Sequence, residues 1–288
     1  MSLAHLRKSP LERIFVGFTY IAMGLYALMI LLPLLYIIQL TLSSANDATF
    51  RIIPKGFTFK HYVYVISAGL IVRPLLNSLY LTAVCTAVAL VLTLLLAYPL
   101  SRKELLGGRV FNFLLILPMM ISLGFLPRYL VVWQLGLLNS YLAIILTSAI
   151  SSFNTIIIRN YFSSIPDSLV ESARMDGCPE VTILARIVVP VAMPAIATIA
   201  LFYMMSVWNK YFDIILYIND TSKHTLQVIL RSLVMEEERY RGTTSDARRY
   251  TENIQYTTIV VALIPVMIVY PLLQKHFVKG IMLGSVKG

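Results

Sequence analysis

The sequence SSIPDSLVESARMDGCPEVTILARIVVPVAMP, residues 163–194, is the long polar interval among apolar segments that does not look like a simple hairpin. Pro166 and Asp167 suit the first turn of a helix, where proline and an acidic side chain are both favoured. Gly177 is predicted to end that helix, because glycine tolerates left-handed backbone angles. A second helix is predicted over Val181–Val189, opened by the Pro-Glu pair before it. The interval therefore predicts a helix–turn–helix elbow.

The first elbow helix is predicted to have two distinct sides. The apolar side comprises Leu169, Val170, Ala173 and Met175. The charged side comprises Glu171, Arg174 and Asp176. The alternative interpretation of the interval is a solvated interfacial loop whose helix ends are capped in the ordinary way.

The composition excludes an ordinary soluble domain. Of 288 residues, 58% are hydrophobic and 13% are charged, and the mean hydropathy is +0.77, whereas soluble domains carry about 25% charged residues. The formal charge of +10 is spread over many short loops without an aromatic–basic recognition motif, which excludes nucleic acid as a partner. Cys85 is expected in a membrane span and Cys178 at the elbow, so neither a disulfide nor a metal site is implied. We predict an all-α, polytopic membrane protein.

Six apolar segments are predicted to form spans, since a helix of about 20 residues crosses a bilayer. They are Ile14–Leu42, Pro74–Leu100, a segment beginning with Val110–Ile121, Tyr141–Tyr161, Ala192–Ile218 and Tyr256–Lys275. Ser43–Arg73 and Asn219–Gln255 are predicted to be polar loops, and Gly124–Ser140 to hold the outer end of the third span and a turn. The chain thus divides into a tail 1–13, a transmembrane domain 14–276 that contains the elbow 163–190, and a tail 277–288.

The elbow also carries a family resemblance. It reads Glu171-Ser172-Ala173, then Asp176-Gly177 and, after nine intervening residues, Ile187-Val188-Val189-Pro190. This resembles the E-A-A-x-x-x-G-x9-I-x-L-P loop of binding-protein-dependent ABC importer permeases. Ser172 stands in place of the usual Ala and Val189 in place of the usual Leu. In that family the loop is a coupling helix that docks into a groove of a cytoplasmic ATPase.

Three further segments carry the same resemblance. Asn77-Ser78 matches the N-S pair near the outer end of the second span in the family. Trp208-Asn209-Lys210-Tyr211 resembles W-N-[DE]-[YF], with Lys210 in the place of an acid. The final segment, HFVKGIMLGSVKG at 276–288, resembles the ending F-V-x-G-[LI]-x-x-G-[SA]-V-K-G of sugar-importer permeases. The chain is therefore similar to carbohydrate-importer permeases of the branch of the second maltose permease, which includes the alginate importer.

The resemblance implies a type I ABC importer permease fold in the inner membrane of a bacterium, with both termini in the cytoplasm. The implied partners are a second homologous permease, two ATPase subunits, an extracytoplasmic saccharide-binding protein and the lipid bilayer. The chain would be no enzyme and would bind no cofactor, because ATP and Mg would lie on the ATPase subunits. The sequence agrees, since it contains no G-x-x-x-x-G-K-[ST] phosphate loop: Gly107-Gly108 is followed by Arg109-Val110.

The resemblance assigns seven residues to coupling with the ATPase: Glu171, Ser172, Ala173, Asp176, Gly177, Ile187 and Pro190. Glu171 would pair with an arginine of the partner, and the small Ala173 would let the helix seat closely in a groove. Ile187 and Pro190 would anchor the elbow onto the spans. In the C-terminal tail the residues expected to contact the ATPase subunits are Gly280, Gly284 and Lys287. The alternative for that tail is a frayed terminus.

Polar and aromatic residues inside spans are candidates for a substrate pathway, because polar groups are costly there. They are Asn77, Asn154, Tyr203, Trp208, Asn209 and Lys210. Aromatic rings stack on the apolar faces of sugars, and amides bind sugar hydroxyl groups. The alternative is that the aromatic side chains lie at the membrane interface and that the Asn side chains bond between helices.

Charge alone does not orient the predicted spans. Lysine and arginine favour cytoplasmic loops, but the 24 Lys and Arg divide evenly here, twelve on each side. We therefore orient the chain by the elbow, which must face the cytoplasm to meet an ATPase. An outer face this basic suggests an acidic substrate, such as alginate, or an acidic partner surface.

Two other functions would suit a polytopic protein. A secondary transporter driven by an ion gradient needs acidic or His residues in mid-span, or internal repeats, and the acids lie almost all in predicted loops, with Asp213 the nearest exception. A membrane-embedded hydrolase needs convergent His, Asp or Glu side chains, and the histidines fall in predicted loops or near span ends. We predict the permease subunit of an ATP-driven saccharide importer, with an ion-driven transporter as the alternative.

Overall fold

The structure is a computed structural model that describes residues 10–43, 56–67, 69, 71–121, 124–240, 254–269 and 271. Among these described residues the elements are helical, with no strand beyond one bridge between Ser43 and Phe57. The all-α prediction is therefore confirmed. The chain forms two compact units, residues 1–68 with 236–260 and residues 69–235 with 261–288.

The first unit contains the long helix α1 (Pro10–Leu42) and the short helix α2 (Lys60–Ser67). The hydroxyls of Thr41 and Tyr62 share a hydrogen bond of 2.8 Å, which ties α2 to the end of α1. With 33 residues, α1 exceeds the length needed to cross a bilayer core of about 30 Å. Its apolar side chains are largely exposed, as suits a helix that faces lipid.

The prediction that Ser43–Arg73 is a loop is wrong at Lys60–Ser67, where α2 forms. Eight residues give too short a periodic pattern to be recognised in the sequence. The helix buries Val65 completely, so its formation depends on packing rather than on helix propensity.

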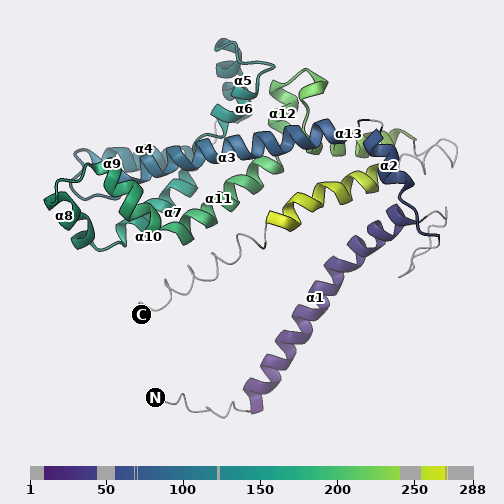
Figure 1. The fold of residues 1–288 in the computed structure, drawn as a ribbon, viewed down its shortest axis with the longest axis horizontal. Coiled ribbons are helices and arrows are strands. Elements are labelled where there is room, and N and C mark those ends of the chain that lie inside the picture. Colours follow the sequence, from purple (N-terminus) through teal and green to yellow (C-terminus); the bar gives the residue numbers. More distant parts are fainter. Residues whose placement is uncertain are drawn as a thin grey trace. The chain divides into compact units, whose positions relative to one another are not determined.

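The second unit is built around α3 (Val72–Leu100), beside which α11 (Met193–Trp208) and α7 (Ser152–Ser163) pack (Figure 1). Two buried clusters lie at different levels of α3. The elbow-side core contains Tyr98 together with residues of α7, α11 and the elbow. The far core contains Cys85, as the sequence predicted for a cysteine inside a span.

The third predicted span is divided between α4 (Gly108–Met120) and α5 (Phe125–Gln134). Pro118 lies in the last turn of α4, where the missing backbone donor weakens the helix. The stretch predicted as an outer span end and a turn therefore begins with the short helix α5.

The fourth predicted span, Tyr141–Tyr161, is not one continuous helix. It consists of α6 (Tyr141–Thr147) and α7, which meet at a bend of 48°. Ser151 caps α7 by accepting a hydrogen bond from the Asn154 backbone N–H at 3.4 Å. The serine-rich break supplies local hydrogen-bond partners that compete with the helix ladder, which explains the interruption.

The fifth predicted span, Ala192–Ile218, is shorter than expected. α11 ends at Trp208, and α12 (Phe212–Tyr217) follows after a break. The predicted loop Asn219–Gln255 is also wrong in part, because it contains the short 3-10 helix η2 (Thr221–Lys223) and α13 (Leu226–Tyr240).

The number of membrane spans depends on how bent helices are counted. α1 and α3 are each long and apolar enough to cross a membrane. Three bent pairs in the described residues meet the same criterion together: α4 with α5, α6 with α7, and Glu180–Val191 with α11. A shorter apolar helix, Ile254–Val269, occupies most of the sixth predicted span, Tyr256–Lys275. Among the described residues the helices are therefore long and apolar enough for two spans, or for up to five if each bent pair is one broken span.

Candidate functional site

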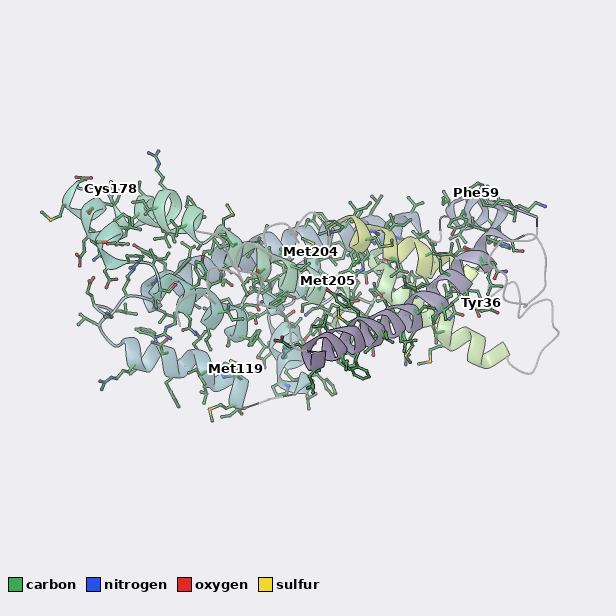
Figure 2. The ribbon with its side chains drawn as sticks, turned by 90° about the horizontal axis from the view of Figure 1, so that it is seen from below. Tyr36, Phe59, Met119, Cys178, Met204 and Met205 are labelled. Atoms are coloured by element: carbon green, nitrogen blue, oxygen red, sulfur yellow. The ribbon has the colours of Figure 1, made fainter. Side chains whose placement is uncertain are left out.

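The predicted elbow is present as a helix–turn–helix at one end of α3 (Figure 1). Its first helix is α8 (Asp167–Met175), with Pro166 just before it. Its second part comprises α9 (Glu180–Ile183), a π-helical segment η1 (Leu184–Val188) and α10 (Val189–Val191). Figure 2 shows Cys178, the thiol of the elbow turn, at that end of the second unit.

The turn between the two elbow helices depends on Gly177. Its φ of 75° lies in the left-handed region. The Gly177 N–H donates to the Arg174 carbonyl at 2.9 Å, and the Cys178 N–H donates to the Ala173 carbonyl at 3.0 Å. These two bonds form a Schellman motif, which satisfies the last carbonyls of α8. The prediction that Gly177 ends the first elbow helix is therefore confirmed.

The apolar side of α8 is narrower than predicted. Val170 and Ala173 are 2% and 6% exposed and belong to the elbow-side core. Met175 is 88% exposed, so its assignment to the apolar side is wrong. At 100° per residue it lies about 140° around the helix from Val170. Ala173, expected to let α8 seat in a partner's groove, packs inside the chain instead.

The remaining predicted coupling residues of α8 lie on its surface. Glu171, Ser172 and Asp176 are exposed. The Ser172 hydroxyl donates to the Ser168 carbonyl at 2.8 Å. Within the part of the chain that the structure describes, Glu171 forms no ion pair, which leaves its carboxylate available to a partner.

The predicted anchors Ile187 and Pro190 differ in their surroundings. Ile187 packs against the elbow-side core, whereas Pro190 is exposed, so the expected packing role of Pro190 is wrong. Pro190 instead explains the π-helical segment before it. A proline lacks the N–H and its ring crowds the carbonyl four residues earlier, and here the Val189 N–H donates to the Leu184 carbonyl, five residues back.

A network of charged and phenolic groups joins the elbow to the end of α3, and we call its four residues the elbow clamp. The Arg174 guanidinium donates to Glu180 at 2.7 Å and to Glu104 at 2.9 Å. The Tyr98 hydroxyl donates to the other Glu180 oxygen at 2.5 Å. The clamp therefore connects α8, α9, α3 and the segment between α3 and α4.

The clamp shifts the titration of its charged members. The hydrogen bond from Tyr98, and then the contact with Arg174, lower the pKa of the Glu180 carboxyl below its usual range. The same contact with Glu180, joined by the one with Glu104, raises the pKa of Arg174 further. Both groups thus stay ionised at neutral pH. Sequence reasoning missed this network, because nothing in the spacing of the residues indicates which charges meet.

A second arginine lies beside the clamp. The Arg102 guanidinium carbon lies 4.9 Å from the centre of the Tyr98 ring, a cation–π distance. Its Nη1 atom is 3.8 Å from a carboxylate oxygen of Asp167, and the Lys103 amine is 3.9 Å from the other oxygen. These contacts bring the first turn of α8 close to the end of α3.

Asn77 and Tyr203, two of the predicted pathway residues, bond within the chain. The Asn77 amide donates to the carbonyls of Ser222 and His224, at 3.0 Å each. The Tyr203 hydroxyl shares a 2.7 Å hydrogen bond with Thr93 and accepts from the Ser151 N–H at 3.1 Å. Both side chains therefore hold elements together, as in the alternative interpretation of polar groups in spans.

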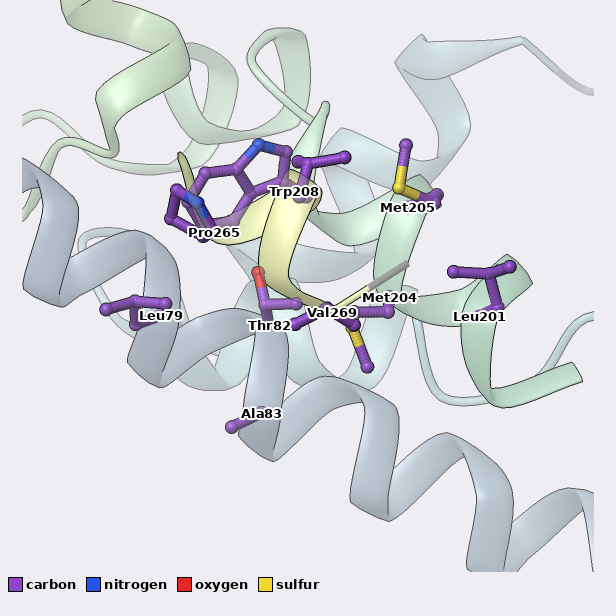
Figure 3. A pocket seen from close by; sticks show the side chains of 10 residues that line it. Leu79, Thr82, Ala83, Leu201, Met204, Met205, Trp208, Pro265 and Val269 are labelled. Carbon is purple, nitrogen blue, oxygen red and sulfur yellow. The ribbon is translucent and has the colours of Figure 1, made fainter. Parts of the chain in front are cut away.

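Trp208 lines an apolar cavity of about 230 Å³ between α3, α11 and the helix Ile254–Val269 (Figure 3). The other residues that line the cavity have aliphatic, methionine or proline side chains, except Thr82, which carries the one hydroxyl group among the lining residues. A saccharide needs several polar partners. This cavity is therefore not suited to a sugar.

The other three predicted pathway residues are not brought together. Asn154 is buried in α7. The Asn209 amide donates to the Met205 carbonyl at 2.8 Å. The Lys210 amine contacts the Asp213 carboxylate at 2.7 Å, and both side chains are mostly buried.

The C-terminal tail and a metal site are the remaining features that the sequence analysis considered. The tail residues Gly280, Gly284 and Lys287 lie outside the described residues, so their contact with an ATPase stays a prediction. The described residues contain no cluster of His, Cys, Asp and Glu suited to a metal ion.

Comparison with known proteins adds independent information. Residues 89–283 match the family described as "Binding-protein-dependent transport system inner membrane component". The chain is 42% identical over 284 residues to the polygalacturonan/rhamnogalacturonan transport system permease protein YtcP of Bacillus subtilis (strain 168), which covers 96% of this chain and 99% of that protein. It is 41% identical to protein LplC of the same organism, over 90% of each.

A solved structure gives a similar result. It is described as the crystal structure of a bacterial ABC transporter involved in the import of the acidic polysaccharide alginate. One of its chains matches with a TM-score of 0.84 and 32% identity, over 93% of this chain and 98% of that chain.

Proposed function

Since the chain belongs to the family of binding-protein-dependent transport system inner membrane components, we propose that it is the transmembrane permease subunit of an ATP-driven importer of a saccharide. The fold is that of an ABC importer permease, in agreement with the sequence prediction. The chain is an inner-membrane component in bacteria. No finding supports the alternative of an ion-driven secondary transporter.

The observation that carries this proposal is the elbow. α8 is anchored in the elbow-side core by Val170 and Ala173 and presents Glu171 to the surroundings. The Schellman turn and the elbow clamp fix it to the end of α3. A push on α8 is therefore transmitted to the spans as a rigid displacement, which is what a coupling element requires.

The proposed assembly has four further subunits. A second homologous permease would complete the translocation path, and an extracytoplasmic binding protein would deliver the saccharide. Two ATPase subunits would hold ATP and Mg and would bind the elbow, so that the chain itself catalyses no reaction. Both termini and the elbow would lie in the cytoplasm, with Gly280, Gly284 and Lys287 reaching the ATPase subunits.

The proposed substrate is an acidic oligosaccharide. Two similar proteins carry the names of uronate-containing polysaccharides, a polygalacturonan in one and alginate in the other. The candidate pathway residues are Asn77, Asn154, Tyr203, Trp208, Asn209 and Lys210. Because their side chains mostly bond within this chain, we place most of the sugar contacts on the partner permease.

The test is ATP-dependent uptake by the purified assembly in proteoliposomes, with oligogalacturonate and a neutral malto-oligosaccharide as substrates. We expect uptake of the acidic sugar that requires ATP inside and the binding protein outside. Uptake driven by a proton or sodium gradient without ATP would overturn the proposal.

A matched pair of glycine variants tests the elbow itself. Gly177 and Gly136 both have φ near 70°, and a Cβ added at either meets no atom within 4 Å. Gly177→Trp should abolish uptake while the assembly remains intact, because the strained turn displaces α8. Gly136→Trp, in a turn before α6, should keep most of the uptake. Normal uptake in the Gly177 variant would refute the coupling role.

A further inference from the structure

A basic pocket lies beside the elbow, where α3 ends and α4 begins. It has a volume of about 640 Å³ and is lined by residues 100–109, Asn112, Arg159, Ser163 and Asp167. Four of its lining side chains are basic and two are acidic, which leaves two positive charges in excess. One of the acids, Glu104, is already bonded to Arg174 at 2.9 Å. The pocket therefore favours an anion.

Arg102 is the buried cation of this pocket. Its side chain is only 10% exposed. Its Nε and Nη2 atoms are buried and have no hydrogen-bond partner among the described residues. The charge itself lies near Asp167, at 3.8 Å, and over the Tyr98 ring, with the guanidinium carbon 4.9 Å from the ring centre. Buried polar groups are nearly always hydrogen-bonded, so the two N–H donors lack the partners that are usual. The two unpaired donors of a planar guanidinium match the oxygens of a phosphate.

The start of α4 adds to the positive electrostatic potential of the pocket. Gly108 and Arg109, the first two residues of this 13-residue helix, both line the pocket. The N-terminal cap, Gly107, offers no side-chain partner to the helix N–H groups, and the Gly108 and Val110 N–H groups donate to the Leu105 and Gly107 carbonyls, at 3.1 and 2.9 Å. The positive end of the helix and the exposed Arg109 guanidinium therefore reinforce the attraction for an anion.

The surface next to the pocket is apolar. Leu106 is 91% exposed at the pocket wall, and Val110 and Phe113 follow on α4, 61% and 58% exposed. A free phosphate gains nothing from such a surface. A phospholipid does, because its acyl chains would cover the apolar residues while its headgroup enters the pocket.

We propose that this pocket binds the phosphate of an anionic phospholipid, with Arg102 and Arg109 as its principal ligands. Lipid bound there would contact the end of α3 and the first turn of α8 through Arg102 and Asp167. The proposal concerns lipid and not the transported saccharide, so it does not depend on the proposed transport function.

Native mass spectrometry of the full-length chain, purified in a neutral detergent, provides the test. Equal amounts of phosphatidylglycerol and phosphatidylcholine are added, and the retained lipid is counted. We expect preferential retention of phosphatidylglycerol, weakened about fivefold for each charge removed in Arg102→Gln and Arg109→Gln. Arg109→Lys should retain most of the binding. Equal retention of both lipids by the wild type would overturn the proposal.

Two controls separate the pocket from other sources of binding. Arg231→Gln removes an exposed charge from α13, outside the pocket, and should leave retention unchanged. Arg109 is exposed, so its substitution tests the site even if Arg102→Gln impairs folding. Retention of inorganic phosphate, with no retention of phosphatidylglycerol, would assign the pocket to free phosphate. A carbodiimide cross-link between Lys103 and a partner carboxylate would assign it to a partner protein instead, and either result contradicts the lipid.

Discussion

At the residue scale, the coupling proposal concentrates on the exposed carboxylate of Glu171. We expect Glu171→Ala to lower ATP-driven uptake by roughly tenfold or more, because a charge-assisted hydrogen bond to a partner contributes about 1.5–3 kcal/mol. Initial uptake rates in proteoliposomes measure this loss. Asp220→Asn, which changes a carboxylate in the segment before η2, should retain normal uptake. Equal losses in the two variants would contradict a specific role of Glu171.

Lys210 and Asp213 make a second prediction at this scale. Since both side chains are mostly buried, Lys210→Met leaves the Asp213 charge without its partner. We expect a loss of about 2–3 kcal/mol in the free energy of unfolding, and recovery of most of it in the double variant Lys210→Met with Asp213→Leu. Thermal unfolding in detergent measures both. An additive, larger loss in the double variant would show that the pair is not coupled.

The elbow clamp gives a prediction at the scale of elements. The pKa of Glu180 is lowered in the folded protein. Ionised Glu180 therefore stabilises the folded state fully above the ordinary carboxyl pKa of about 4.3. This contribution is lost as the pH falls through the lowered pKa of Glu180. At pH 7 we expect Glu180→Gln to lower stability by about 1 kcal/mol, since the group is half exposed. The difference in melting temperature between wild type and variant should disappear on acidification.

The control for the clamp is on the same elbow. Glu171→Gln removes an exposed carboxylate of α8 that lies outside the clamp, so its effect on stability should be small. Tyr98→Phe removes the donor to Glu180 and should reproduce part of the Glu180→Gln effect. A pH-independent difference for Glu180→Gln would contradict the ionic origin of the stabilisation.

Local signals explain which elements the sequence predicted correctly. The start of α8 and its end at Gly177 follow from proline, acid and glycine chemistry that acts within a few residues. The break in the fourth span was missed, because the Ser151 N–H that it frees is satisfied by Tyr203 from a distant helix. The elbow clamp was missed for the same reason, since its members lie up to 82 residues apart.

At the scale of the whole molecule, the second unit has two distinct ends, and its orientation in the membrane can be tested. The elbow packs at the Leu100 end of α3, while Asn77 bonds the segment around η2 at the other end. Loop charges divide evenly and do not decide which end is cytoplasmic. The coupling proposal does decide it, because an elbow that binds an ATPase must face the cytoplasm.

Two engineered cysteines report this orientation. Met175→Cys lies on the exposed side of α8, and Leu135→Cys lies in the turn after α5, where the side chain is also largely exposed. In a Cys178→Ser background, a membrane-impermeant maleimide should label Met175→Cys only in inside-out vesicles stripped of peripheral proteins. It should label Leu135→Cys only in right-side-out vesicles. The buried Cys85 should stay unlabelled in both. The reverse labelling pattern would place the elbow outside the cell, where no ATPase can reach it.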